Sequence, residues 1–190
     1  MKALEAYLNQ IVSFTNEEME VFTSLFSVVE LKKNEYLALE GEYATRLAFL
    51  SRGVIRAFYR NDKGVEYNKT FFFNQGFVGA YSSLVTGNIN TINIQCLTPC
   101  TLFIADYSQI TKLYHTHPKV ERLARILAEY FFVSKEKREI ELVMLDATKR
   151  YRIFQEEHPG LENIIQQYHI ASYLGVSPTQ LSRIRAKKQK

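Results

Sequence analysis

Hydrophobic positions near the start of the chain recur at the three- and four-residue spacing of an amphipathic helix. Leu4, Leu8 and Val12 share one helical face, which predicts a first helix there. Thr15 is followed three residues later by Glu18, and this capping-box pattern predicts the start of a second, short helix. The chain is therefore expected to open with two helices.

The period of the hydrophobic pattern changes to two between residues 30 and 105, which indicates β-strands. Residues 91–96 alternate strictly between polar and apolar side chains, and residues 61–64 give a turn signal between two strand-like runs. Short strands punctuated by glycine are typical of an antiparallel β-roll or barrel. We therefore expect a β-roll in this middle part of the chain.

Helical periodicity returns after Pro118 in the clearest amphipathic stripe of the sequence. The apolar positions of this stripe that we expect at a subunit interface are Val120, Leu123, Leu127 and Phe131. A long helix with one apolar edge favours a homodimer seam, and packing of that edge on the chain's own β-roll is the alternative. Asp146 is expected to be the N-cap of a fresh helix, which predicts a hinge at this point.

The segment HIASYLGVSPTQLSRIRAK, residues 169–187, predicts two short helices joined by a tight turn. The second helix is expected to start at Pro178, because a missing N–H costs nothing at the first helical position. Ser177 and Gln180 complete a Ser-x-x-Gln capping box. The pattern leaves polar side chains on the open side of the second helix, which is the geometry of a DNA-reading helix-turn-helix. A helical hairpin with a solvated basic tail is the alternative.

The distribution of charge supports the DNA-binding interpretation. Residues 163–190 contain no acid and five bases, whereas all 20 acids lie in residues 1–162 beside 19 of the 24 bases. The first region therefore carries a charge of −1 and the tail +5, which add to the formal net charge of +4. Such local asymmetry is the expected footprint of a surface that binds phosphates.

The remaining residues exclude several other classes of protein. We find no nucleophile–base pair, and no histidine precedes His115, so no enzyme, metal site or haem is expected in the roll. The two cysteines, Cys96 and Cys100, are too few for an iron–sulfur cluster and are expected to fill core space. No apolar run resembles a signal peptide or membrane span. We expect a cytoplasmic protein without a cofactor.

With a β-roll, a long helix and a helix-turn-helix in this order, the chain resembles the Crp–Fnr superfamily of bacterial transcription regulators. Within it, the closest resemblance is to the short members typical of Bacteroidetes-type bacteria. Further marks of this resemblance are Glu40-Gly41-Glu42, Phe77-Val78-Gly79 and Lys149-Arg150-Tyr151. The resemblance implies an α+β protein with a cyclic-nucleotide-binding-like jelly roll (1–117), a connecting and dimerisation helix (118–145) and a helix-turn-helix domain (146–190).

The resemblance also implies a homodimer that binds a two-fold-related site in double-stranded DNA, with half-sites about 34 Å apart. RNA polymerase and an unidentified small-molecule effector are further candidate partners. The expected base-reading residues are Thr179, Gln180, Ser182 and Arg183. Arg183 is the strongest of these, because its planar guanidinium can bond guanine O6 and N7 together. The expected phosphate contacts are Ser177, Arg185, Lys187, Lys188 and Lys190. The β-wing usual in the family is expected to be missing.

Family members that bind cyclic nucleotides carry a Phe-x-Gly-Glu turn, followed about ten residues later by an Arg-Ser/Thr pair that holds the phosphate. Here Ala80 takes the place of the glutamate and Asn90 that of the arginine. The residues of this degenerate pocket are Gly79, Ala80, Tyr81, Ser82, Ser83, Asn90 and Thr91. A cyclic phosphate buried without a cation lacks its charge-assisted bonds, so tight binding of cyclic AMP or cyclic GMP is not expected. A metabolite- or nucleotide-sensing β-roll with weak, non-specific DNA contact is the alternative function.

Overall fold

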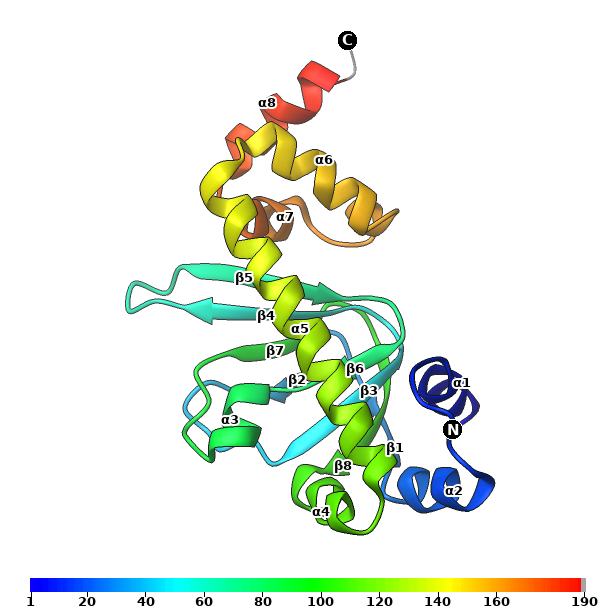
Figure 1. The fold of residues 1–190 in the computed structure, drawn as a ribbon. Helices are drawn as coiled ribbons and strands as arrows, with labels where there is room; N and C mark the ends of the chain where they lie inside the picture. Colours follow the sequence, from blue (N-terminus) through cyan, green and yellow to red (C-terminus); the bar gives the residue numbers. More distant parts are fainter. Residues whose placement is uncertain (189–190) are drawn as a thin grey trace. The chain divides into compact units, whose positions relative to one another are not determined.

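The computed structural model describes residues 1–188, and these form two compact units (Figure 1). The first unit consists of residues 1–57 and 71–130, and the second of residues 58–70 and 131–190. Across the described residues, no helix is both long and apolar enough to cross a membrane.

Two helices open the first unit, as the hydrophobic pattern predicts. The first, α1 (Lys2–Ile11), buries Leu4 and Leu8, and the second, α2 (Asn16–Ser24), begins with the expected capping box. The N–H of Glu18 donates to the Thr15 hydroxyl at 3.2 Å, and the N–H of Thr15 donates to the Glu18 carboxylate at 2.7 Å. These two bonds satisfy backbone donors that a helix start otherwise leaves without partners.

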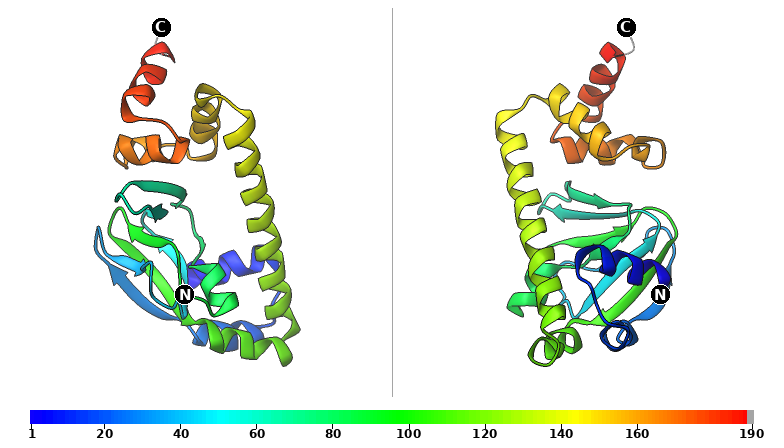
Figure 2. Two further views of the ribbon diagram at one scale, coloured as in Figure 1. Left: turned by 90° about the vertical axis from the view of Figure 1, so that its left-hand side faces the viewer. Right: turned by 45° about the vertical axis from the view of Figure 1, so that its right-hand side comes forward.

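The strands form two four-stranded sheets, which confirms the expected antiparallel β-roll (Figures 1 and 2). One sheet has the order β1-β8-β3-β6, and the other β2-β7-β4-β5. The pairs β1–β8, β3–β8, β3–β6 and β2–β7 are antiparallel. The strands of the first sheet are β1 (Ser27–Leu31), β8 (Cys100–Asp106), β3 (Arg46–Arg52) and β6 (Gly76–Val78). Those of the second are β2 (Tyr36–Ala38), β7 (Asn93–Cys96), β4 (Ile55–Arg60) and β5 (Glu66–Phe72).

Strand alternation divides the buried side chains of the first unit between two clusters. Successive side chains of a strand point to opposite faces of the sheet, so β3 contributes Leu50 to one cluster and Phe49 to the other. The cluster with Leu50 fills the inside of the roll and includes Ile94 and Ile104 from the two sheets. Cys96 and Cys100 are buried in this cluster as free thiols, which agrees with their expected role as core residues.

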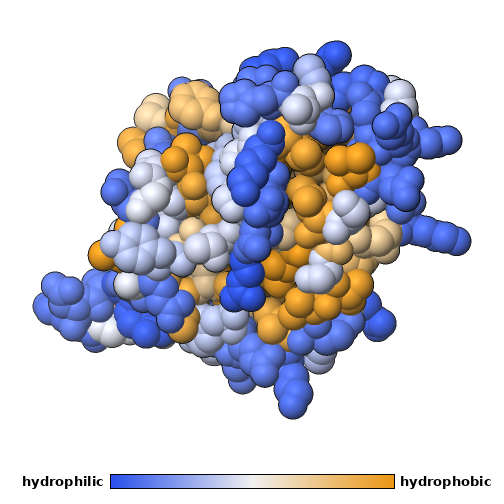
Figure 3. All heavy atoms as spheres, turned by 90° about the horizontal axis from the view of Figure 1, so that it is seen from below, coloured by the Kyte–Doolittle hydropathy of each residue, from blue (hydrophilic) through white to orange (hydrophobic). Residues whose placement is uncertain are grey.

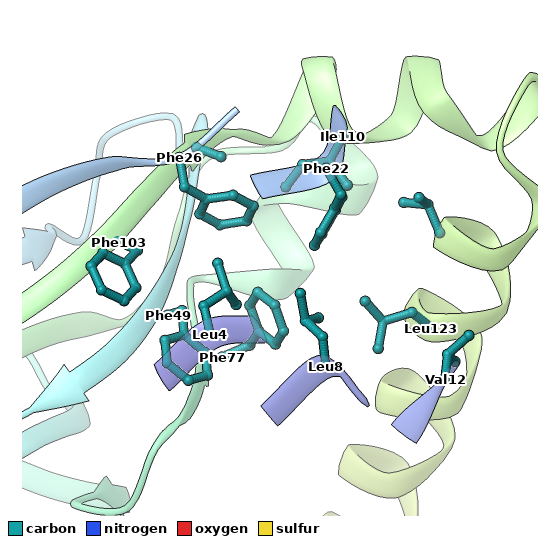
Figure 4. Packing of buried hydrophobic residues seen from close by; sticks show 12 residues of the cluster. Leu4, Leu8, Val12, Phe22, Phe26, Phe49, Phe77, Phe103, Ile110 and Leu123 are labelled. Carbon is teal, nitrogen blue, oxygen red and sulfur yellow. The ribbon is translucent and has the colours of Figure 1, made fainter. Parts of the chain in front are cut away.

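The cluster with Phe49 lies where helices cover the first sheet (Figure 4). Phe49 stacks on Phe103 with ring centroids 6.1 Å apart and meets Phe77 edge-on at 5.6 Å. Val120 and Leu123 of α5 (Pro118–Met144) are only 1% and 2% exposed in this cluster. This corrects the expectation that these two side chains face a partner subunit, because they already pack within the chain.

Short helices complete the first unit. They are α3 (Tyr81–Thr86), α4 (Tyr107–Lys112) and the 3-10 turn η1 (Leu113–His115). Seen from below, hydrophobic residues gather beside a hydrophilic ridge on the surface (Figure 3). Apolar side chains that reach the surface of this unit include Val28, Val85 and Ile89. Exposed apolar side chains such as these three are ordinary on protein surfaces and define no site by themselves.

The second unit carries the helical C-terminal part of the chain. Its elements after α5 are α6 (Ala147–Glu157), the 3-10 turn η2 (Leu161–Asn163), α7 (Gln167–Leu174) and α8 (Pro178–Lys188). Asp146 is the N-cap of α6, as expected, and accepts a hydrogen bond from the N–H of Lys149 at 2.9 Å. The buried side chains of this unit include Phe154, Leu161 and Leu174.

Candidate nucleic-acid interface

The turn between α7 and α8 has the geometry that the sequence predicts. Gly175 ends α7 in the left-handed conformation, with φ 68° and ψ 36°. The N–H of Val176 donates to Ala171 O at 3.0 Å and that of Gly175 to Ser172 O at 3.2 Å, which together form a Schellman motif. A side chain at Gly175 would strain this conformation, so glycine is favoured here.

The predicted capping box at the start of α8 is present. The N–H of Gln180 donates to the Ser177 hydroxyl at 3.2 Å, and the N–H of Ser177 donates to Gln180 Oε1 at 2.9 Å. The helix begins at Pro178, as expected. Because the cap uses both side chains, a DNA contact of Gln180 is limited to its amide NH2, and the Ser177 hydroxyl already has a partner.

The apolar contact between α7 and α8 leaves the opposite side of α8 exposed to solvent. Ile170, Leu174 and Leu181 are each at most 1% exposed, so α8 packs on α7 through its apolar face. The expected base-reading residues Thr179, Gln180, Ser182 and Arg183 are all exposed. Lys187 is exposed on the same helix, one turn beyond Arg183. The side chain of Lys188 and the whole of Lys190 lie outside the described residues.

Arg185 differs from the other predicted phosphate contacts. It is half-buried, and its positive charge lies close enough to the hydroxyl of Tyr151 in α6 to favour the ionised form of that hydroxyl. That hydroxyl also donates to Glu162 at 2.6 Å, and burial together with this carboxylate raises the pKa of Tyr151 to about 12. Arg185 also lines, with Pro178 and Leu181 among others, a hollow of about 450 Å³ beside α8. The positive charge of Arg185 therefore serves partly to hold α8 against α6.

Two arginines fix α7 against the end of α5. Arg138 donates to the carbonyl of Tyr173, and its guanidinium lies 3.9 Å from the centroid of the Tyr173 ring. Arg150 donates to the carbonyl of Leu174 at 3.1 Å and to that of Leu145. The carbonyls at the C-terminal ends of α7 and α5 carry partial negative charge, so arginine side chains stabilise them. The orientation of the helix-turn-helix within its unit depends on these contacts.

Asn90, the residue expected in place of a phosphate-binding arginine, is held by the backbone of the roll. It is 4% exposed, and its amide donates to Leu39 O at 2.7 Å and to Ile92 O at 2.6 Å. Its carbonyl accepts from the N–H of Ile92 at 3.0 Å. All the polar atoms of this side chain are thus used to hold neighbouring backbone, and none carries positive charge.

The other residues of the predicted degenerate pocket differ in burial. Ala80 is 2% exposed and packs in the apolar interior of the roll. A side chain at Gly79 would lie 3.2 Å from both Leu47 and Leu84, so space there is short. Ser83 is buried and donates to Asn88 O at 2.6 Å. The three remaining residues, which are exposed, are Tyr81, Ser82 and Thr91.

Some residues that shape these sites carry no recognisable sequence signal. Arg56 is only 4% exposed, and it donates to Gln95 Oε1 through Nε at 2.9 Å and through a terminal nitrogen at 2.7 Å. Arginine in a strand is usually solvated, so its burial could not be foreseen from its neighbours. The role of Arg138 could not be predicted either, because this residue lies within a run of polar residues on α5.

The fold, a β-roll followed by a long helix and a helix-turn-helix, is shared with bacterial transcription regulators. Residues 28–117 match the family described as cyclic nucleotide-binding domain. Among curated proteins, none matches the chain significantly in sequence.

Three solved structures share this fold over most of their length. CLP, a c-di-GMP-responsive global regulator of Xanthomonas campestris, is 16% identical with a TM-score of 0.73, and 90% of each chain is covered. FixK2 of Bradyrhizobium japonicum is 15% identical with a TM-score of 0.74, covering 85% of this chain and 83% of that one. A Eubacterium rectale protein assigned to the Crp/Fnr family of transcriptional regulators is 16% identical with a TM-score of 0.73, covering 93% and 84%. At these identities the likeness concerns the fold.

Proposed function

We propose that the protein is a Crp–Fnr-type transcription regulator that reads double-stranded DNA with α8. The observation that carries this proposal is the exposure of a polar and basic side of α8 on a helix fixed by a Schellman turn, a capping box and an apolar seam. Such a helix can enter the major groove with its exposed residues toward the base edges. As a DNA-binding protein of a bacterium, it would act in the cytoplasm.

Some exposed residues of α8 suit contacts with bases, which determine sequence preference, and others suit contacts with phosphates, which add affinity. Arg183 is exposed and presents a planar group that can bond one guanine through two hydrogen bonds. Lys187 lies one helical turn further on and suits a phosphate, which adds affinity for every sequence alike. The absence of acids after Glu162 keeps repulsion of DNA by this part of the chain low.

We further propose a homodimer whose seam lies on the exposed edge of α5. Apolar side chains recur along α5 with the 3–4 spacing of a coiled coil at Tyr130, Val133, Ile140 and Met144, which are 66%, 61%, 56% and 73% exposed. The residue between Val133 and Ile140 at this spacing is Lys137, which donates to Glu157 of α6 within the same chain. Two parallel copies of α5 would bury these side chains and present two α8 helices to a two-fold-related site. Of the residues expected at this interface, Phe131 is 40% exposed and Leu127 is half-buried in the first unit.

The β-roll, we propose, has lost tight binding of cyclic nucleotides. Asn90 supplies no cation, and Ala80 supplies no carboxylate for a ribose hydroxyl. Calorimetry should therefore detect no low-micromolar binding of cyclic AMP or cyclic GMP, and such binding would overturn this part of the proposal. RNA polymerase and a small-molecule effector stay predicted partners.

Selection of binding sites from random duplexes tests DNA reading directly. The proposal expects a palindromic consensus, and salt-sensitive binding without a consensus would favour the sensing module instead. Arg183→Ala should cost about 1–3 kcal/mol on the selected site and relax discrimination at one base pair. Lys187→Ala, the matched control on the same helix, should weaken binding to all sequences alike and lower the salt slope by about 1. Unchanged affinity in both variants would overturn the mechanism.

A further inference from the structure

The strand β5 stands at the end of its sheet, so one side of its backbone has no neighbouring strand. Within the second unit, this edge meets α7, the first helix of the helix-turn-helix. The N–H of Asn68 donates to the hydroxyl of Ser172 at 2.9 Å, and the same hydroxyl donates to Glu66 O at 2.7 Å. One side chain of α7 therefore satisfies a donor and an acceptor of the strand edge.

The Ser172 hydroxyl makes the two hydrogen bonds that a neighbouring strand would make with this edge of β5. Residues 66 and 68 are two apart, so their backbone groups point to the same side of β5. A residue of a parallel neighbouring strand would donate to the first and accept from the second. A hydroxyl has one proton and two lone pairs, so the single oxygen of Ser172 can do both. Alanine could do neither.

The side chain of Asn68 makes a further contact with α7. We call these contacts between the edge of β5 and α7 the junction. Its amide donates to the carbonyl of His169 at 2.9 Å, and Asn68 and His169 are only 6% and 4% exposed. His169 and Ser172 lie one turn apart on α7, so the strand edge follows one face of that helix. Hydrogen bonds of this kind contribute about 1 kcal/mol each. A role of the junction in DNA reading requires that these bonds open at a lower free energy than the helix-turn-helix unfolds.

We infer that Ser172 is a positioning residue for DNA reading, which holds α7 on the β5 edge in the arrangement that binds DNA. The inference rests on the proposed function. Its support is that the base-reading residues of α8 are exposed while the junction is closed, so docking on β5 leaves the reading side open. Opening the junction lets α7 and α8 leave this arrangement. A protein whose binding-competent state is less populated has a proportionally lower apparent affinity.

Amide exchange reports on the junction without any DNA. In Ser172→Ala, the Asn68 N–H loses its acceptor, so it should exchange at least about tenfold faster than in the parent. The Asn61 N–H, which donates to Val65 O at 3.0 Å within the same hairpin, should be unaffected and shows that the hairpin is folded. Ser172→Thr keeps the hydroxyl and should retain protection. Tyr67→Phe, at an exposed side chain of the same strand, is the matched control.

Operator affinity of the same variants completes the test. If α7 stays on the β5 edge in about one molecule in ten, Ser172→Ala should bind the selected duplex about tenfold more weakly than the parent. Ser172→Thr and Tyr67→Phe should bind it as the parent does. Unchanged exchange at Asn68 in Ser172→Ala would overturn the junction itself. Faster exchange with equal or tighter DNA binding would overturn the positioning role and leave the proposed function intact. A parent protein without operator binding would instead refute the proposed function, and the exchange data would still report on the junction.

Discussion

The guanidinium of Arg138 lies over the ring of Tyr173 at 3.9 Å from its centroid and also donates to the carbonyl of that residue. The same guanidinium is 3.5 Å from Glu141, whose side chain is only 7% exposed. One arginine of α5 thus compensates a buried carboxylate and holds the end of α7. Stability of the second unit should depend on it more than on a surface ion pair.

Arg138→Met should lower the free energy of unfolding by about 2 kcal/mol, because it leaves the buried Glu141 carboxylate with only Lys137 at 3.9 Å. Chemical denaturation followed by circular dichroism measures this loss. The matched variant is Arg138→Met with Glu141→Leu, which removes both charges and should recover part of the stability. Strictly additive losses in the double variant would mean that the two side chains do not interact.

The α5 seam predicts which substitutions separate the subunits. Val133→Glu or Ile140→Glu would bring like charges together at a two-fold seam, so the dimer dissociation constant should rise by at least about 100-fold. Sedimentation equilibrium measures this change. Phe132→Glu is the matched control, because Phe132 is 67% exposed and lies one residue outside the 3–4 pattern. A dimer that tolerates Val133→Glu but not Phe132→Glu would place the seam on another face.

The start of α8 could be predicted because its signals are local in the sequence. Which side chains of α5 pack within the chain could not, because that depends on contacts between distant segments. The capping box of Ser177 and Gln180 depends on residues three apart, so the sequence alone specifies it. The stripe containing Val120 and Leu123 has helical spacing, but spacing does not say whether a partner or the chain's own helices cover it. The closeness of Arg185 to Tyr151 likewise depends on the packing of separate helices and has no local signature.

Gly53 should be among the least replaceable residues of the roll. Its φ is +113°, and a Cβ there would lie 2.5 Å from Cys100 Sγ and 2.7 Å from Pro99 O. Gly53→Ala should therefore cost about 3 kcal/mol in the free energy of unfolding, from backbone strain and from the clash. Gly87→Ala separates the two causes, because Gly87 has φ +70° with nothing within 4 Å of such a Cβ. It should cost only about 1 kcal/mol. Equal losses in the two variants would show that the clash is relieved.

The capping carboxylate of α2 predicts a pH dependence of stability. The ion pair with Lys119 at 2.7 Å, followed by the Thr15 N–H, lowers the pKa of Glu18 to about 2. A carboxyl whose pKa is depressed on folding stabilises the fold above its unfolded value of about 4.3, and this contribution is lost as the pH falls toward the folded value. Glu18→Gln should therefore melt at a lower temperature than the parent at pH 7.

The difference between the two melting temperatures should shrink as the pH falls below about 4.3 and become small near pH 2, where Glu18 is about half protonated. Calorimetry at a series of pH values measures it. Glu20→Gln, at an exposed position of the same helix, is the matched control and should follow the parent throughout. A difference that stays constant from pH 7 to pH 2 would mean that Glu18 acts through its shape in the capping box and not through its charge.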